Sequence, residues 1–325
     1  MVSVLVRIFG SEHIQLAEDV VQEALLAALE NWKINGIPDN PRAWLYRTSK
    51  NKAIDLIRRK KHLNYFDFSQ PDQQLLTSEY SLAPTMDQFW EEKAIKDDFL
   101  GMMYACCHPG VSQENQVTFI LKSLCGFSTA EVAKAFLSPE DTISKRLYRT
   151  KEFFRNERFR PQVPPVSVVK ERTPAVLNAI YLMFNEGYHS THSDDLIRED
   201  VIAQSLWLCK SLLDHDVTNL PETNALMALM CLHTSRFNSR LDANGEIVLL
   251  SEQDRSKWDK ELIEAGSKYI YASQFGKHLS SYHLEAAISF EHCLAEDYDS
   301  TNWERIVIHY DALLRIHYDP VVDLN

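Results

Sequence analysis

Apolar residues recur at helical spacing along nearly the whole chain, and strand-like alternation is almost absent. Near the amino terminus, for example, Leu16, Val20, Ala24 and Ala28 form a single apolar stripe. Helix start signals accompany the pattern, as where Asn40 precedes a proline and supplies an N-cap. Glycine is scarce, with 9 residues in 325, which leaves little material for phosphate-binding glycine loops. The chain is therefore predicted to be all-α.

Interruptions of this periodicity divide the chain into modules. Residues 1–63 form a first helical module, and residues 64–88, rich in Gln, Ser, Asp and Pro, form a linker. Residues 89–159 form a second helical module, which a proline-rich hinge at 160–172 follows. The remaining residues, 173–325, form a larger helical domain. Its expected helices are Pro174–Phe184, Arg198–Leu213, Glu222–Thr234, Glu252–Ile270, Ser280–Leu294 and Trp303–Ile316.

The net charge of −12 is distributed unevenly. Residues 1–170 carry 22 Lys and Arg against 21 Asp and Glu, whereas residues 171–325 carry 12 against 25. Within the first half, Arg42–His62 has a net charge of +7 and Ile143–Arg160 one of +5. Two basic islands ahead of an acidic body indicate a polyanion-binding portion, and two solvated helix faces are an equally good interpretation.

The cysteines and the apolar segments favour a cytoplasmic protein. Six cysteines, at 106, 107, 125, 209, 231 and 293, show no regular disulfide framework. Cys106, Cys107 and His108 resemble half of a zinc site, but no second pair lies at finger spacing, so we expect two buried thiols and no metal. No apolar run is long enough to span a bilayer, and no signal cleavage site follows Met1–Phe9.

The helix predicted from Pro41 to about Lys61 has two unlike faces. One face carries three cations and an amide within about a third of the circumference, and the opposite face can pack in a core. The polar face consists of Arg47, Lys50, Asn51 and Arg58, and the packing face of Leu45, Ser49, Ala53 and Leu56. Cations neutralise phosphates, and an asparagine can hydrogen-bond a base edge. Trp44 and Tyr46 could stack on an unpaired base, and Trp44 fits a core position equally well.

A helix-turn-helix pattern is predicted within Val117–Phe154. A helix capped by Ser128 is followed by a basic helix, with Ser138 predicted at its N-cap and Pro139 at its first position. On that last helix Ile143 and Leu147 share an inward face. The outward face and its margins carry Ser144, Lys145, Arg146, Tyr148, Arg149 and Lys151. The second helix of this motif enters the DNA major groove, and an ordinary helical hairpin with a solvated basic face is the alternative.

Together the two modules resemble a known family. The segments LAEDVVQEA from Leu16 and PRAWLYRTSKNKAIDLIRR from Pro41 resemble region 2 of bacterial extracytoplasmic-function (ECF) sigma factors. The segments GFSTAEVA from Gly126 and TISKRLYRTK from Thr142 resemble their region 4. The rest is similar to the subgroup with a long helical, tetratricopeptide-like carboxy-terminal extension, on the segments Tyr181–Tyr188, Asp254–Asp259 and Tyr282–Ile288. Relative to that subgroup, the extension is expected to be truncated.

The resemblance implies a role for each matching position. An acidic stripe would bind the clamp helices of the polymerase β′ subunit, and it consists of Glu18, Asp19, Gln22, Glu23 and Leu26. The −10 element would be held as single strand by Trp44, Arg47, Lys50, Asn51, Lys52, Arg58 and Arg59. The −35 duplex would be read by Ser144, Lys145, Arg146, Tyr148 and Arg149, although Arg149 could instead brace its module. The acidic extension would regulate these contacts, alone or through a regulatory partner.

Two other functions remain open, and enzymatic activity is not expected. A freestanding helix-turn-helix repressor would have an effector-binding helical domain, and a helical scaffold would bind no DNA. Glu186, His189, His192 and Asp194-Asp195 are conceivable metal ligands, and His283 with Glu285 a conceivable acid–base pair. Neither set has a spacing that fixes a known geometry, so we expect no catalytic residues, metal or cofactor.

Overall fold

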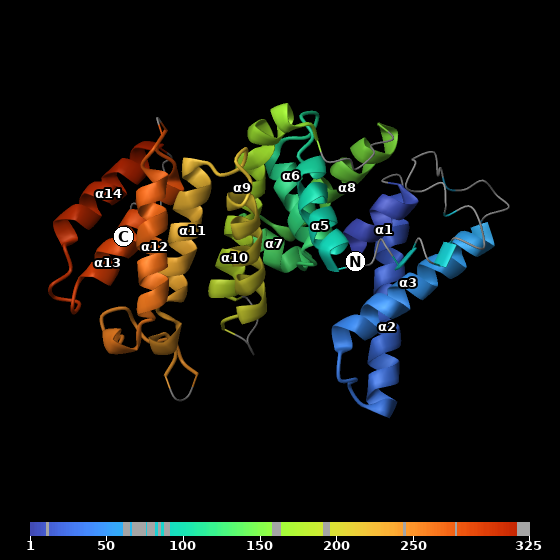
Figure 1. Cartoon of the computed structure of the whole chain (residues 1–325), viewed down its shortest axis with the longest axis horizontal. Helices are drawn as coiled ribbons and strands as arrows, with labels where there is room; N and C mark the ends of the chain where they lie inside the picture. Colours follow the sequence, from blue (N-terminus) through green and yellow to red (C-terminus); the bar gives the residue numbers. More distant parts are fainter. Residues whose placement is uncertain are drawn as a thin grey trace. The chain divides into compact units, whose positions relative to one another are not determined.

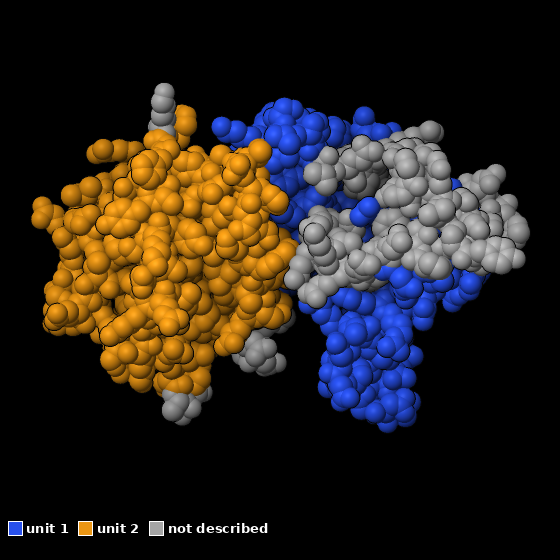
Figure 2. All heavy atoms as spheres, in the orientation of Figure 1, with its two compact units in different colours: residues 1–179 blue, residues 180–325 orange. Residues whose placement is uncertain are grey.

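The structure is a computed structural model that describes residues 1–10, 13–60, 66, 76, 82–83, 86–87, 92–157, 164–190, 196–242, 245–276 and 278–316, with only the backbone at 92–98. Within these residues the regular elements are helices, apart from one isolated antiparallel bridge between Leu241 and Ile247, which confirms the all-α prediction. The chain divides into two compact units, residues 1–179 and 180–325 (Figures 1 and 2). None of the described helices is both long and apolar enough to cross a bilayer.

The first three helices of unit 1 are α1 (Val2–Phe9), α2 (Ile14–Asn35) and α3 (Pro41–Lys60). Helix α1 is buried along most of its length, and α2 packs against both α1 and α3 (Figure 1). The predicted stripe of α2 is buried at Val20, Ala24 and Ala28. Ala17 rather than Leu16 completes it, because Ala17 lies closer to the centre of the helix face. Asn40 caps α3 as predicted, since its Oδ1 accepts from the Ala43 N–H at 2.9 Å.

The rest of unit 1 contains α5 (Glu92–Cys106), α6 (Gln113–Phe119), a π-helical turn (Ile120–Leu124), α7 (Thr129–Ala135) and α8 (Glu140–Asn156). Helices α7 and α8 pack together as a helix-turn-helix pair. Ser128 and Glu131 form the capping box that starts α7. The cap of α8 differs from the prediction: Pro139 occupies the N-cap, because the Ser138 hydroxyl instead donates to the Phe136 carbonyl at 3.0 Å.

Unit 2 is a helical assembly around one fully enclosed helix. It holds the end of α9 (Val166–Tyr188), then α10 (Glu199–Leu213), α11 (Pro221–Thr234), α12 (Lys260–Ser273), α13 (Ser281–Leu294) and α14 (Trp303–Ile316). Every residue of α11 from Thr223 to Leu232 is buried, as expected of a central helix. Helices α10, α12 and α13 surround it, and α14 packs on α13 (Figure 1).

Two boundaries in the second half of the chain differ from the predictions. Helix α9 begins at Val166, so the last residues of the predicted hinge at 160–172 are helical. The Pro165 carbonyl accepts hydrogen bonds from the N–H groups of Val168 and Val169 and thereby starts the first turn. The helix predicted over Glu252–Ile270 begins only at Lys260. The reason is a cap: the Asp259 carboxylate accepts from the N–H groups of Glu261 and Leu262, and a short 3₁₀ turn (Arg255–Lys257) precedes it.

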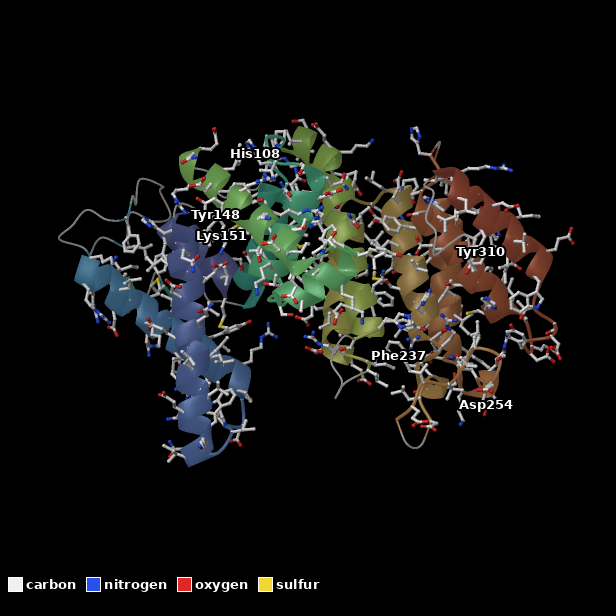
Figure 3. All side chains as sticks on the ribbon, turned by 180° about the vertical axis from the view of Figure 1, so that it is seen from behind. His108, Tyr148, Lys151, Phe237, Asp254 and Tyr310 are labelled. Carbon is white, nitrogen blue, oxygen red and sulfur yellow. The ribbon has the colours of Figure 1, made fainter. Side chains whose placement is uncertain are left out.

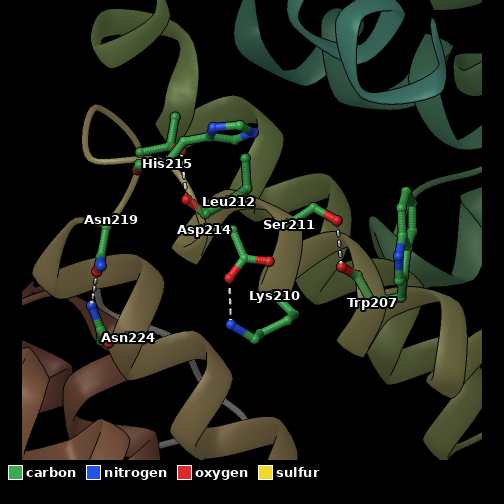
Figure 4. A network of polar contacts seen from close by, with 9 residues as sticks. Trp207, Lys210, Ser211, Leu212, Asp214, His215, Asn219 and Asn224 are labelled. Atoms are coloured by element: carbon green, nitrogen blue, oxygen red, sulfur yellow. Dashed lines mark hydrogen bonds and ion pairs between the residues drawn. The ribbon is translucent and has the colours of Figure 1, made fainter. Parts of the chain in front are cut away.

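Polar contacts fix the turn between α10 and α11 (Figure 4). Lys210 forms an ion pair with Asp214 at the end of α10. Across the turn, the Asn224 side-chain amide donates to Asn219 Oδ1 at 2.8 Å. These contacts hold the entry to the central helix of unit 2.

Candidate polymerase and nucleic-acid interface

Helix α2 presents the predicted acidic stripe on its exposed side. Asp19, Gln22, Glu23 and Leu26 are all exposed, and Leu26 retains 59% of its accessible surface. Leu25 and Leu29 extend this apolar component, with exposed fractions of 44% and 69%. The face therefore combines carboxylates with exposed leucines, a composition that fits docking on a basic partner helix.

Two members of the stripe already have partners within unit 1. The Glu23 carboxylate accepts from Lys52 Nζ of α3 at 3.0 Å. The Glu18 carboxylate accepts from Lys151 Nζ of α8 at 2.6 Å, and Gln15 Oε1 lies 3.4 Å from the same nitrogen. Asp19 accepts only a local bond from the Gln15 amide at 3.2 Å among the described residues, so its carboxylate remains the most accessible of the stripe.

Helix α3 separates its two faces as predicted. Arg47, Asn51, Arg58 and Arg59 are exposed. The packing face is buried at Ser49 and Ala53, and Ile54 and Ile57 join it, whereas Leu45 and Leu56 are half-buried. The buried face of α3 is therefore centred closer to Ala53 and Ile57 than predicted.

Two other predicted −10 residues, Lys50 and Lys52, form ion pairs, and a third, Trp44, is partly packed. Lys50 forms an ion pair with Asp87, and Lys52 with Glu23, so both cations are partly neutralised. Trp44 is half-buried with its ring against Trp32, at 5.6 Å between centroids and 67° between planes. Trp44 is thus partly packed, as a core position predicts, and partly accessible, as stacking on a base requires.

Helix α8 has a clear division between core and surface. Ile143 and Leu147 are buried as predicted. Ser144, Lys145, Tyr148 and Arg149 are exposed, with Tyr148 at 63% (Figure 3 labels Tyr148 and Lys151 on this helix). Lys145 also contacts Asp141 one turn earlier, at 2.6 Å. The surface offers two cations, a hydroxyl and a phenol on consecutive turns.

Arg146, not Arg149, braces the helix-turn-helix module. Arg146 Nη2 donates to Glu114 Oε2 of α6 at 2.6 Å, and its guanidinium lies over the Phe136 ring at 5.4 Å. Its side chain is only 19% exposed. Arg149 is exposed and has no ion pair among the described residues. Arg149 thus lies on the outward face predicted for it, and the bracing position that was its alternative is occupied by Arg146.

The predicted cysteine pair is buried, and the two residues of the predicted acid–base pair form separate hydrogen bonds. Cys106 and Cys107 are buried, as predicted, and burial raises the pKa of Cys107 to about 12. Glu285 accepts from the Tyr181 hydroxyl at 2.8 Å, whereas His283 Nδ1 accepts from the Ser280 N–H at 3.1 Å. The two side chains therefore serve separate hydrogen bonds. His192 and Asp194-Asp195 lie outside the described residues.

Sequence reasoning missed a group of arginines in unit 2. Arg236 and Arg240 are buried, with exposed fractions of 8% and 6%. They follow α11 in a segment without helical periodicity, so no pattern distinguished them from surface cations. Their surroundings are described below.

Comparison with known proteins gives matches in both halves of the chain. A family model described as Sigma-70 region 2 matches residues 1–63, and one described as a family of unknown function (DUF6596) matches residues 172–274. The uncharacterized protein R00370 of Rhizobium meliloti (strain 1021) is 33% identical over 317 residues, which cover 96% of this chain and 73% of that protein. The ECF RNA polymerase sigma factor SigW of Bacillus subtilis (strain 168) is 27% identical over 151 residues, which cover 46% of this chain and 79% of that protein. No solved structure matches the chain.

Proposed function

Since the chain belongs to the same family as the Rhizobium meliloti protein and begins with a sigma-70 region 2, we propose that it is an ECF-type sigma factor that directs RNA polymerase to promoters. The observation that carries the proposal is the separation of three surfaces in unit 1. One exposed face of α2 is acidic and apolar, while exposed faces of α3 and α8 are basic. A factor that joins an enzyme to DNA needs both kinds of surface.

Helix α2 docks on the polymerase in this proposal. Asp19, Gln22 and Leu26 make the first contacts, because they are exposed and carry no ion pair among the described residues. Glu18 and Glu23 join them after exchanging Lys151 and Lys52 for basic groups of the clamp helices. The exchange replaces one ion pair by another, so its net electrostatic cost is small.

Helices α3 and α8 then engage the two promoter elements. On α3, Asn51 reads an unpaired base of the −10 element while Arg47, Arg58 and Arg59 hold phosphates. On α8, Ser144, Lys145, Tyr148 and Arg149 face the −35 duplex, and Arg146 keeps the helix on its module. Because phosphate contacts dominate, promoter affinity falls steeply as salt rises.

The acidic extension regulates these contacts in the same proposal. Residues 171–325 carry 12 basic against 25 acidic side chains, so they compete electrostatically with DNA for the basic helices. Deletion of residues 189–325, which keeps unit 1 and all of helix α9, is then expected to change promoter transcription. Unchanged polymerase binding and unchanged transcription would contradict a regulatory role.

Run-off transcription with core polymerase tests the proposal against its alternatives. Transcripts from a candidate promoter only when core polymerase and the protein are both present support a sigma factor. A repressor would instead bind duplex DNA tightly without polymerase, and a scaffold would show no salt-dependent DNA binding. Either of these outcomes without transcripts would overturn the proposal.

A further inference from the structure

Unit 2 holds a cluster of three arginines, of which Arg236 and Arg240 are buried and Arg255 is half-buried. The Arg240 guanidinium lies 3.6 Å from the centroid of the Tyr188 ring, and its Nη2 lies 2.8 Å from His189 Nδ1. Arg236 Nη2 donates to the Tyr188 hydroxyl at 3.3 Å. Arg255 is held by backbone carbonyls, since its Nη1 donates to His292 and Ala295 at 2.6 and 2.9 Å. We refer to Arg236, Arg240 and Arg255 as the arginine cluster.

Arg236 and Arg240 have no carboxylate counter-ion among the described residues, and Arg255 is influenced by the charge of the exposed Asp297, which opposes the effect of burial on the pKa of Arg255. None of the three arginines forms an ion pair with a carboxylate there, although residues 171–325 are strongly acidic overall. The Nε atoms of Arg236 and Arg240 are buried and have no hydrogen-bond partner. Burial lowers the pKa of Arg255, which Cys293 and Asp297 partly oppose, and burial also lowers the pKa of Arg240. Burial of a cation without a counter-ion costs free energy, so its presence in a folded protein indicates a function.

The neighbouring histidines add no further positive charge to the arginine cluster near pH 7. Burial and the adjacent Arg236 lower the pKa of His292 to about 4. Burial and the same arginine also lower the pKa of His233, whose Nε2 lies 2.9 Å from the Ser289 hydroxyl. Both rings are therefore neutral near pH 7, and the site retains its positive charge.

A pocket opens next to the arginine cluster. It has a volume of about 470 Å³ and is lined by Arg255, Trp258, Lys260, Cys293 and Glu296 among others. The Trp258 ring joins the pocket to the cluster, because Arg255 lies 5.0 Å and Arg236 5.9 Å from its centroid. Glu296 is the one carboxylate of the lining, and it is exposed. The volume lies in the range of small-molecule sites, which are about 300–1,000 Å³.

We propose that this pocket binds a small anion carrying phosphate or carboxylate groups, with Arg255 and Lys260 at the pocket wall and Arg236 supplying buried positive charge. The anion would neutralise the cluster and strengthen the packing of α12 and α13 around Trp258. The site lies wholly within unit 2 and does not depend on the proposed role in transcription.

Titration of the full chain with inorganic phosphate and with citrate tests the proposal, with sodium chloride at equal ionic strength as the reference. A ligand that binds only the folded state raises the midpoint of thermal unfolding with the logarithm of its concentration once that concentration exceeds Kd. Millimolar concentrations are compared, because the general stabilisation by excluded anions is small there. We expect phosphate, citrate or both to raise the midpoint above the chloride value, and the stronger of the two identifies the preferred group. The net charge of −12 opposes unspecific anion binding. Equal midpoints in all three salts would overturn the proposal.

Two variants at neighbouring lysines locate the site. Lys260→Gln removes a pocket cation and should weaken anion affinity about tenfold, the loss expected for one charge-assisted hydrogen bond. Lys257→Gln makes the same charge change three residues earlier, at an exposed side chain outside the pocket lining, and should leave the affinity unchanged. Equal weakening by both variants would mean that the anion acts through general charge and would contradict a site.

Arg236→Met distinguishes a ligand-binding arginine from a structural one. It removes the buried charge and keeps a long side chain. We expect the anion-free variant to unfold at the same or a higher temperature, because an uncompensated charge is gone, and to lose the anion-dependent rise. A lower midpoint together with an intact anion-dependent rise would show that Arg236 is structural and would contradict its part in the site.

Discussion

Lys151 of α8 and Glu18 of α2 form an ion pair of 2.6 Å that joins two of the three functional surfaces of unit 1. Both side chains are largely buried, with exposed fractions of 26% and 15%. Glu18 belongs to the proposed polymerase-binding stripe, and Lys151 lies at the margin of the proposed −35 surface. Full use of the stripe therefore requires this contact to open.

Breaking this ion pair should cost stability and favour polymerase binding. A double-mutant cycle with Glu18→Gln and Lys151→Ala is expected to give a coupling free energy of about 1 kcal/mol in urea unfolding. Lys151→Ala should also bind core polymerase more tightly, because Glu18 is then free for the partner. Unchanged polymerase affinity in Lys151→Ala would place Glu18 outside the docking surface.

Substitution of Arg146 should lower stability, whereas substitution of Arg149 should weaken DNA binding. Arg146→Ala removes the contact to Glu114 and the packing on Phe136, so we expect the free energy of unfolding to fall by about 1–2 kcal/mol. Arg149→Ala removes an exposed cation and should leave stability unchanged while reducing the salt dependence of −35 DNA binding by about one phosphate contact. The reverse pattern would show that the roles are exchanged.

Glu285 should make unit 2 less stable as the pH rises. Burial raises the pKa of Glu285 from 4.5 to about 7, although hydrogen bonds from Tyr181 and Ser281 oppose the shift. Between these values the folded state holds a proton that the unfolded state has lost, so stability falls with increasing pH and is then constant above about pH 7.

Comparison with Glu285→Gln isolates this effect. The variant keeps an acceptor for the Tyr181 hydroxyl and cannot ionise. Its stability relative to the wild-type protein should increase between about pH 5 and pH 7, as measured by urea unfolding across that range. A stability difference that does not vary with pH would contradict the raised pKa.

The fold was predictable where a local signal and the tertiary packing agree. Asn40 and Ser128 cap the helices that the sequence assigned to them, because a cap depends only on neighbouring backbone. The prediction that Ser138 caps α8 was wrong for an equally local reason, because the Ser138 hydroxyl donates to the Phe136 carbonyl instead. The start of α12 was predicted too early, because apolar spacing alone does not reveal that Asp259 supplies the cap.

The candidate surfaces were predictable as helix faces but not as contacts. Spacing placed Asn51 and Arg149 on exposed faces, because periodicity determines which side of a helix is polar. Spacing could not show that Arg146 turns to Glu114, or that Lys151 reaches Glu18 over more than a hundred residues of sequence. Such partners depend on how separate helices pack, and the arginine cluster was missed for the same reason.

Asp19→Lys tests whether the exposed face of α2 joins this protein to core polymerase for transcription. Asp19 is exposed and outside every ion pair of the described residues, so the variant should fold normally. Asp311→Lys makes the same charge change at an exposed position of α14 and serves as the control. In run-off transcription with core polymerase, we expect Asp19→Lys to abolish promoter-specific transcripts and Asp311→Lys to retain them. Equal transcription by both variants, with both fully folded, would contradict this role of α2.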